Sequence, residues 1–229
     1  MGLVGSPEPE TPITEPEPRP GPPARVRLLG RALNATVAHA PWLWPLLKRP
    51  VASYFDELAD DWDERSGAPG ASHLAPLAVA VTKIDRRPER ALDIGTGTGV
   101  AALFLAREFP RASIRGIDVS EQMIKQAKAK VGLDPDGRVA FRVGDASALP
   151  WDEDHFDLVT QLNMPPFFAE TARVLRHGGH VIVAASSGDR TPFFTPDAVL
   201  ERGFARYGFE TVKVGRIGSG SYFVARKGR

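Results

Sequence analysis

The stretch ALDIGTGTG, residues 91–99, indicates which class of fold the chain adopts. Its first four residues form a short, mostly apolar run typical of a buried strand, and three glycines follow at alternate positions. Glycine permits positive φ angles and lets a ligand approach the backbone closely. A helical pattern at 100–108 comes next, so the stretch predicts a strand, a glycine-rich loop and a helix in succession.

The same alternation continues toward the C-terminus. We expect strands at 91–94, 113–118, 139–143, 156–160 and 180–185, with helices at 100–108, 121–130 and 167–175. Strands that alternate with helices of this length predict βαβ units and a parallel sheet.

The final part of the chain departs from this pattern. A helix at 197–207 precedes strands at 210–216 and 221–226, which only four residues join. So short a connection cannot make a parallel crossover, so the last strand should run antiparallel to its neighbour. The predicted fold class is α/β: a Rossmann-like seven-stranded sheet, mostly parallel with an antiparallel last strand, with helices on both faces and further helices at the N-terminus.

Composition divides the 229 residues into three segments. Residues 1–23 hold 8 of the 21 prolines and few apolar residues, which predicts a disordered tail. Residues 24–85 should form a helical cap, with a second helix that begins near Pro50. Residues 86–229 should form the core.

Charge and cysteine content exclude several functions. The net charge is +1, which does not favour nucleic-acid binding, and the absence of cysteine excludes disulfides and thiol catalysis. No apolar run is long enough to span a bilayer and no secretory signal is recognisable, so we expect a cytoplasmic protein without stable membrane insertion. Residues 24–50 (net +5) and 54–65 (net −5) are expected to pair within the fold.

Three carboxylates are expected at the carboxyl ends of strands, where open α/β sheets bind ligands. Asp118 follows Gly99 by nineteen residues, where an acid accepts hydrogen bonds from ribose hydroxyls. Asp93 precedes the glycine loop, where its charge disfavours a pyrophosphate, and Asp145 follows the third strand. Three acids favour a cationic nucleoside without phosphate, and S-adenosylmethionine has these properties. Val119 and Met123 offer an apolar surface for adenine, although core packing explains Met123 equally well.

Five ordered blocks resemble the class I S-adenosylmethionine-dependent methyltransferases: 92–99, 116–120, 144–150, 156–159 and 173–180. Residues 54–63 also look like the helix that precedes the core in the branch that includes quinone-biosynthesis methyltransferases. The resemblance implies S-adenosyl-L-methionine as the cofactor and a small-molecule acceptor, with the methylated atom (O, C or N) and the oligomeric state left open.

The resemblance also implies a role for each site residue. Asp93 and the loop residues Gly95, Thr96, Gly97 and Gly99 would hold the methionine portion. Asp118 would hold the ribose, Asp145 the adenine amino group and Ala146 the face of the ring. Gln161, expected just after the fourth strand, would lie near the sulfonium.

Methyl transfer needs chiefly alignment of the acceptor with the cofactor, so the lack of a recognisable triad is compatible with an enzyme. No catalytic residue can be named. His73 is a candidate base if the nucleophile must lose a proton, and a histidine satisfied in the core is the alternative. His177 and His180 flank two glycines, but nothing completes a metal site and none is expected.

Aromatic residues suggest a partly apolar acceptor: Trp42, Trp44, Phe167, Phe168, Phe193 and Phe194. If the helix before the core covers the cofactor, Tyr54, Trp62 or Arg65 would lie near it. Residues 161–168 resemble the Asn-Pro-Pro-aromatic signature of nitrogen methyltransferases, but Met164 interrupts it. Two alternatives stay open: a non-catalytic cofactor-binding or scaffold protein, and an NAD-dependent oxidoreductase.

Overall fold

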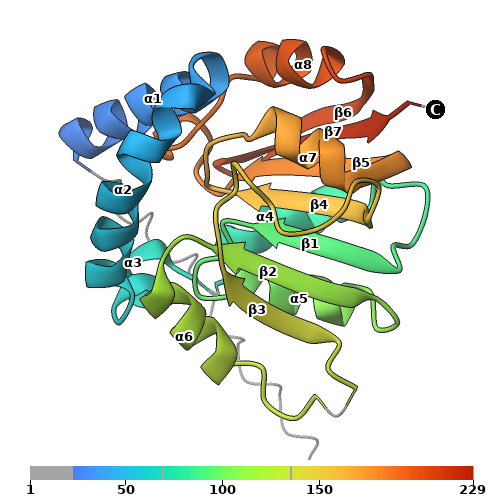
Figure 1. Ribbon diagram of the computed structural model, residues 1–229, viewed down its shortest axis with the longest axis horizontal. Helices are drawn as coiled ribbons and strands as arrows, with labels where there is room; N and C mark the ends of the chain where they lie inside the picture. Colours follow the sequence, from blue (N-terminus) through green and yellow to red (C-terminus); the bar gives the residue numbers. More distant parts are fainter. Residues whose placement is uncertain (1–22, 69, 135, 229) are drawn as a thin grey trace, which may run out of the picture.

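The computed structural model describes residues 23–68, 70–134 and 136–228, so the predicted tail lies almost wholly outside the described part (Figure 1). Its centre is a seven-stranded sheet with the order β3-β2-β1-β4-β5-β7-β6. The strands are β1 (Arg90–Ile94), β2 (Ser113–Asp118), β3 (Val139–Val143), β4 (Phe156–Leu162), β5 (Leu175–Ala185), β6 (Phe209–Ile217) and β7 (Gly220–Lys227).

Strands β1 to β5 are parallel, and β7 lies antiparallel between β5 and β6. This confirms the predicted fold class, including the antiparallel last strand. The strand order reverses between β1 and β4, and such a reversal opens a crevice at the carboxyl ends of the strands.

Two layers of helices cover the sheet. α4 (Ala71–Val81), α5 (Val100–Glu108) and α6 (Glu121–Ala129) bury apolar side chains in one core cluster. α7 (Phe168–Val174) and α8 (Asp197–Ala205) do so in the other. α4 falls within the predicted cap segment, yet Leu77, Ala80 and Val81 place it on the face of the sheet.

The remaining N-terminal helices cross the carboxyl ends of the parallel strands (Figure 1). They are α1 (Ala24–His39), a short 3-10 turn (Pro41–Leu43), α2 (Trp44–Leu58) and α3 (Trp62–Ser66). The predicted start of the second helix was wrong, because α2 begins at Trp44 and contains Pro50. Pro45 occupies its first turn, where a proline needs no amide hydrogen, while Pro50 is tolerated on an exposed side of the helix.

Strand boundaries also differ from the prediction, most of all in β5. β5 starts at Leu175, about five residues earlier than expected, and its register against β4 shifts between Phe156 and Leu158. The residues just before 180, expected to lie outside the strand, therefore form an irregularity within it, with Gly178 at a φ of 77°.

Candidate active site

The glycine-rich loop has the conformation that its sequence predicts. Gly95, Gly97 and Gly99 have φ angles of 66°, 52° and 84°. A β-carbon on Gly95 would lie 2.6 Å from the sulfur of Met164, whereas one on Gly97 would meet only Trp62, at 3.7 Å. The backbone at Gly97 is therefore open to the pocket, as close contact with a ligand requires.

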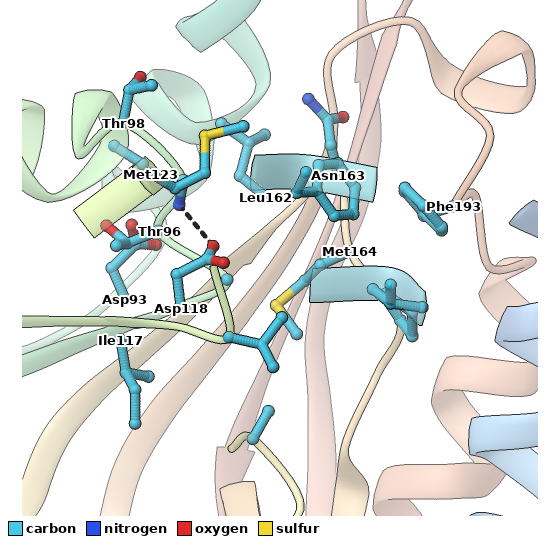
Figure 2. Close-up of a pocket in the computed structure, with 18 of the residues that line it drawn as sticks. Asp93, Thr96, Thr98, Ile117, Asp118, Met123, Leu162, Asn163, Met164 and Phe193 are labelled. Carbon is cyan, nitrogen blue, oxygen red and sulfur yellow. Dashed lines mark hydrogen bonds between the residues drawn. The ribbon is translucent and has the colours of Figure 1, made fainter. Parts of the chain in front are cut away.

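Asp118, at the end of β2, organises this loop. Its Oδ2 accepts a 2.8 Å hydrogen bond from the amide of Gly97 (Figure 2), and its Oδ1 accepts one of 3.0 Å from the amide of Ser120. Ser120 in turn caps α6, because its Oγ accepts from the amide of Met123 at 3.1 Å. Burial raises the pKa of Asp118, and the backbone hydrogen bonds oppose that increase.

Asp93, near the end of β1, carries an unpaired oxygen. Its Oδ1 accepts a 2.7 Å hydrogen bond from Thr160, but its buried Oδ2 has no partner within the described residues. Burial raises the pKa of Asp93 to about 6. A buried carboxylate oxygen without a donor is unfavourable, so this position fits a ligand that brings a cation or a hydrogen-bond donor.

Two residues of helix α2 bind the carboxylate of Asp145. Trp44 Nε1 donates to Asp145 Oδ1 at 2.7 Å, and Lys48 Nζ lies 3.1 Å from Oδ2. The Trp44 ring packs edge-on against Phe167, with 5.1 Å between centroids. Partial burial raises the pKa of Asp145, but hydrogen bonds from Ser147, Trp44 and Lys48 outweigh burial and lower it overall.

The acidic segment at the end of α2 attaches the cap to the core. Asp56 accepts hydrogen bonds from Ser120 Oγ at 2.5 Å and from the amide of Gln122 at 3.1 Å. Asp63 accepts from Thr98 Oγ1 at 2.5 Å and pairs with Lys130. These acids, which we expected to pair with residues 24–50, contact α6 and the glycine loop instead.

A cavity of about 120 Å³ lies beneath the cap and contains most of the predicted cofactor residues. Its wall includes eight of the eleven: Asp93, Gly95, Thr96, Gly97, Asp118, Val119, Met123 and Ala146. In Figure 2, Asp93, Thr96 and Asp118 lie on one side of the cavity and Asn163 and Phe193 on the other.

The other three predicted residues are not on that wall. Asp145 faces α2, as described above. A β-carbon on Gly99 would lie 2.8 Å from Phe141, so this glycine allows α5 to pack closely. Gln161 donates to Thr171 Oγ1 at 2.7 Å, because β4 continues to Leu162 and Gln161 therefore lies within the strand, not after it.

Several wall residues were missed by the sequence reasoning. Leu162, Asn163 and Met164 occupy the place expected for Gln161. Asn163 has a φ of 57° and bonds to Ser186, and neither property has a sequence signal. From the N-terminal segment, Leu33, Val51 and Phe55 line the cavity.

The predicted aromatic residues divide among different environments. Trp44, Trp62, Phe167 and Phe193 line the cavity, and Tyr54 lines a neighbouring groove. Trp42 is exposed, Phe168 is in the core, and Phe194 lies under Arg31. Arg65 bonds to Asp61, away from the cavity.

His73 has the geometry of a neutral base at the cavity wall. Its Nδ1 lies 3.2 Å from the carbonyl oxygen of Ser66. Because a carbonyl only accepts hydrogen bonds, Nδ1 carries the proton and Nε2 keeps a lone pair. Burial lowers the pKa of His73, which favours the neutral form. His177 and His180 have separate partners, the carbonyl of Gly228 and Asp85.

The sheet order, the glycine loop and the carboxylates at the ends of β1 and β2 are together typical of the class I methyltransferase fold. Residues 91–179 match the family model described as "Methyltransferase domain". This part of the chain is therefore similar to the methyltransferase domains of that family.

Curated relatives agree with this assignment. Over 128 residues the chain is 32% identical to phthiotriol/phenolphthiotriol dimycocerosates methyltransferase of Mycobacterium leprae, covering 53% of this chain and 46% of that protein. Over 137 residues it is 32% identical to demethylmenaquinone methyltransferase of Thermotoga maritima, covering 59% and 58%. The chain thus spans about half the length of these relatives.

Solved structures share the fold. The [4+2]-cyclase SpnF matches with a TM-score of 0.63 and 21% identity over 78% of this chain and 95% of that one. Geranyl diphosphate C-methyltransferase from Streptomyces coelicolor A3(2), solved with S-adenosyl-L-homocysteine, matches with a TM-score of 0.57 and 15% identity over 67% of this chain and 78% of that one.

Among the described residues, none of the helices combines the length and the apolar composition that spanning a bilayer requires.

Proposed function

We propose that the protein transfers the methyl group of S-adenosylmethionine to a small, partly apolar acceptor. The observation that carries this proposal is the position of Asp93 and Asp118 on the wall of one cavity, with the open backbone of Gly97 between them. The unpaired Asp93 Oδ2 suits the ammonium of the methionine portion, and Asp118 suits the ribose hydroxyls.

The adenine would lie beside Val119, Met123 and Ala146, which form the apolar part of the wall. Asp145 Oδ1 already accepts three hydrogen bonds, from Trp44 and from the amide and hydroxyl of Ser147. Its Oδ2 receives only Lys48 within the described residues and keeps capacity for the adenine amino group. In this role the Trp44–Asp145 contact places the cap directly over the adenosyl end.

The bound cofactor supplies a methyl group on a sulfonium that leaves as a neutral thioether. The chain's own contribution is to exclude water and to align the acceptor behind that methyl group, for which the cap residues Leu33, Val51 and Phe55 provide an apolar wall. A bond forms between the acceptor and the methyl carbon as the carbon–sulfur bond breaks. Where the nucleophile carries a proton, Nε2 of His73 accepts it.

Turnover tests this proposal against a non-catalytic binding role. The protein is incubated with methyl-labelled S-adenosylmethionine and a panel of phenols, quinones, amines and lipids. We expect label in a partly apolar acceptor, and less label with Asp118→Ala at a subsaturating cofactor concentration. Tight cofactor binding without transfer to any acceptor would favour a scaffold, and a product that lacks the label would indicate chemistry other than methyl transfer.

A further inference from the structure

The outer surface of the cap exposes an unusual amount of apolar side chain. Leu28 and Leu29 on α1 are 72% and 70% exposed, and Trp42 in the 3-10 turn and Leu46 at the start of α2 are 72% and 74% exposed. Elsewhere in the described residues, only Leu133 among the large apolar side chains is exposed to this degree. Grouped exposure of this kind marks an interaction surface.

The same segment is rich in positive charge. Residues 24–50 contain four arginines and one lysine and no acid, although Lys48 is paired with Asp145. Arg25 and Arg49 are exposed, on the helices that carry Leu28 and Leu46. The nearest acids in sequence do not neutralise this face, because Asp56 and Asp63 are bonded to α6 and the glycine loop. The surface therefore combines leucine, tryptophan and arginine.

A groove of about 440 Å³ lies between α1 and α2. Leu29 and Tyr54 line it and are also exposed, so they stand at its mouth. Four further lining residues also line the cofactor cavity: Leu33, Val51, Phe55 and Phe193. The groove and the cavity therefore adjoin across shared apolar side chains, and Figure 1 shows both helices at the carboxyl edge of the sheet.

We propose that the α1–α2 surface docks onto an anionic phospholipid bilayer and that the groove receives the apolar chain of a lipid-like acceptor from it. Leucine and tryptophan enter the interface while arginine stays at the level of the phosphates, which is how interfacial helices bind. A second copy of the chain is a poorer partner, because a symmetric contact would bring two faces that carry exposed arginines, among them Arg25 and Arg49, together. The groove's role as an acceptor site rests on the proposed function, whereas the docking does not.

Sedimentation with vesicles tests the docking. The full chain is mixed with vesicles of phosphatidylcholine alone or with about one-third phosphatidylglycerol, and we expect it to pellet with the anionic vesicles and to be released by salt. Leu28→Glu with Leu46→Glu should reduce binding at least tenfold. Leu133→Glu, at an even more exposed leucine away from the cap, should not.

Three results would overturn the docking proposal. The first is equal recovery in the supernatant with both vesicle types. The second is a dimer in light scattering that Leu46→Glu dissociates, since a second copy would then cover the face. The third is vesicle binding that appears only after residues 1–22 are removed. Circular dichroism checks that each variant is folded.

Binding of cis-parinaric acid, a fluorescent lipid chain, tests the groove without turnover. Ala32→Trp fills the groove and should weaken binding at least tenfold, whereas Ala35→Trp, exposed on the same helix but not lining the groove, should leave it unchanged. Equal binding by both variants would contradict the assignment. Titration with S-adenosylhomocysteine in parallel separates failure of the groove from failure of the cofactor site.

Discussion

The indole of Trp44 donates a 2.7 Å hydrogen bond to the carboxylate of Asp145, which lies 101 residues further along the chain. This contact joins the N-terminal cap to the end of β3, beside the cavity proposed to hold the cofactor. The cap and the proposed adenosyl end of the site therefore meet at a single carboxylate.

Trp44→Phe removes this hydrogen bond and retains an aromatic ring that can pack against Phe167. A hydrogen bond to a charged group contributes roughly 1.5–3 kcal/mol, so amide exchange in residues 24–58 should accelerate by about tenfold or more. Hydrogen–deuterium exchange with mass spectrometry measures this. Trp42→Phe, at an exposed ring in the adjoining turn, is the matched control and should exchange like the parent protein.

Asp118→Ala should weaken S-adenosylhomocysteine binding by roughly 1–3 kcal/mol, or about 5- to 150-fold. The substitution removes the proposed ribose partner and also the acceptor for the amide of Gly97. Calorimetric titration measures the change, with Asp152→Ala as an exposed control. An affinity equal to that of the parent protein would show that the ribose lies elsewhere.

Asp93→Asn should stabilise the ligand-free protein near pH 7. Burial raises the pKa of Asp93 from 3.8 to about 6, so the folded state favours the protonated form. The resulting stabilisation is complete below pH 3.8 and is lost as the pH rises through 6. At about 1.4 kcal/mol per pKa unit, the ionised group destabilises the fold by up to about 3 kcal/mol above pH 6. Denaturant unfolding at pH 7 measures the gain in the free energy of unfolding. A variant less stable than the parent protein would show that the charge of Asp93 is already compensated in the ligand-free fold.

The same carboxylate predicts how cofactor affinity depends on pH. Only ionised Asp93 attracts an ammonium, so affinity for S-adenosylhomocysteine should fall as the pH decreases through about 6. Titrations between pH 5 and pH 8 test this, and the Asp93→Asn variant should bind weakly at every pH. A flat profile for the parent protein would remove Asp93 from the site.

His73→Gln should lower kcat by about 100-fold or more if the acceptor loses a proton, while leaving affinity for S-adenosylhomocysteine nearly unchanged. Because the pKa of His73 is lowered by burial, the acidic limb of the rate profile should lie below the usual 6.5. His155→Gln is the control at a histidine away from the cavity. Equal rates for the two variants would mean that His73 takes no proton.

Strand register explains which parts of the site were predictable. Asp93 pairs with Gly116, so the end of β2 brings Asp118 beside the loop that follows β1. The sequence predicts that these two carboxylates lie close together, because the carboxyl ends of neighbouring parallel strands meet at the same edge of the sheet. The predicted position of Gln161 was wrong because β4 runs two residues further than expected, to Leu162. Gln161 therefore lies within the strand and not after it.

The cap was not predictable in this way. Trp44, His73 and Asn163 reach the cavity through tertiary contacts that no periodicity specifies. The acids of 54–65 were expected to pair with the neighbouring basic residues, but Asp56 finds better partners at the N-terminus of α6, where backbone amides need acceptors.

Calorimetric titration of the full chain with S-adenosylhomocysteine and, separately, with NADH distinguishes an S-adenosylmethionine site from a dinucleotide site. We expect saturable binding of S-adenosylhomocysteine that Asp118→Ala weakens, and no binding of NADH, whose pyrophosphate would meet Asp93. Binding of NADH without binding of S-adenosylhomocysteine would contradict this expectation.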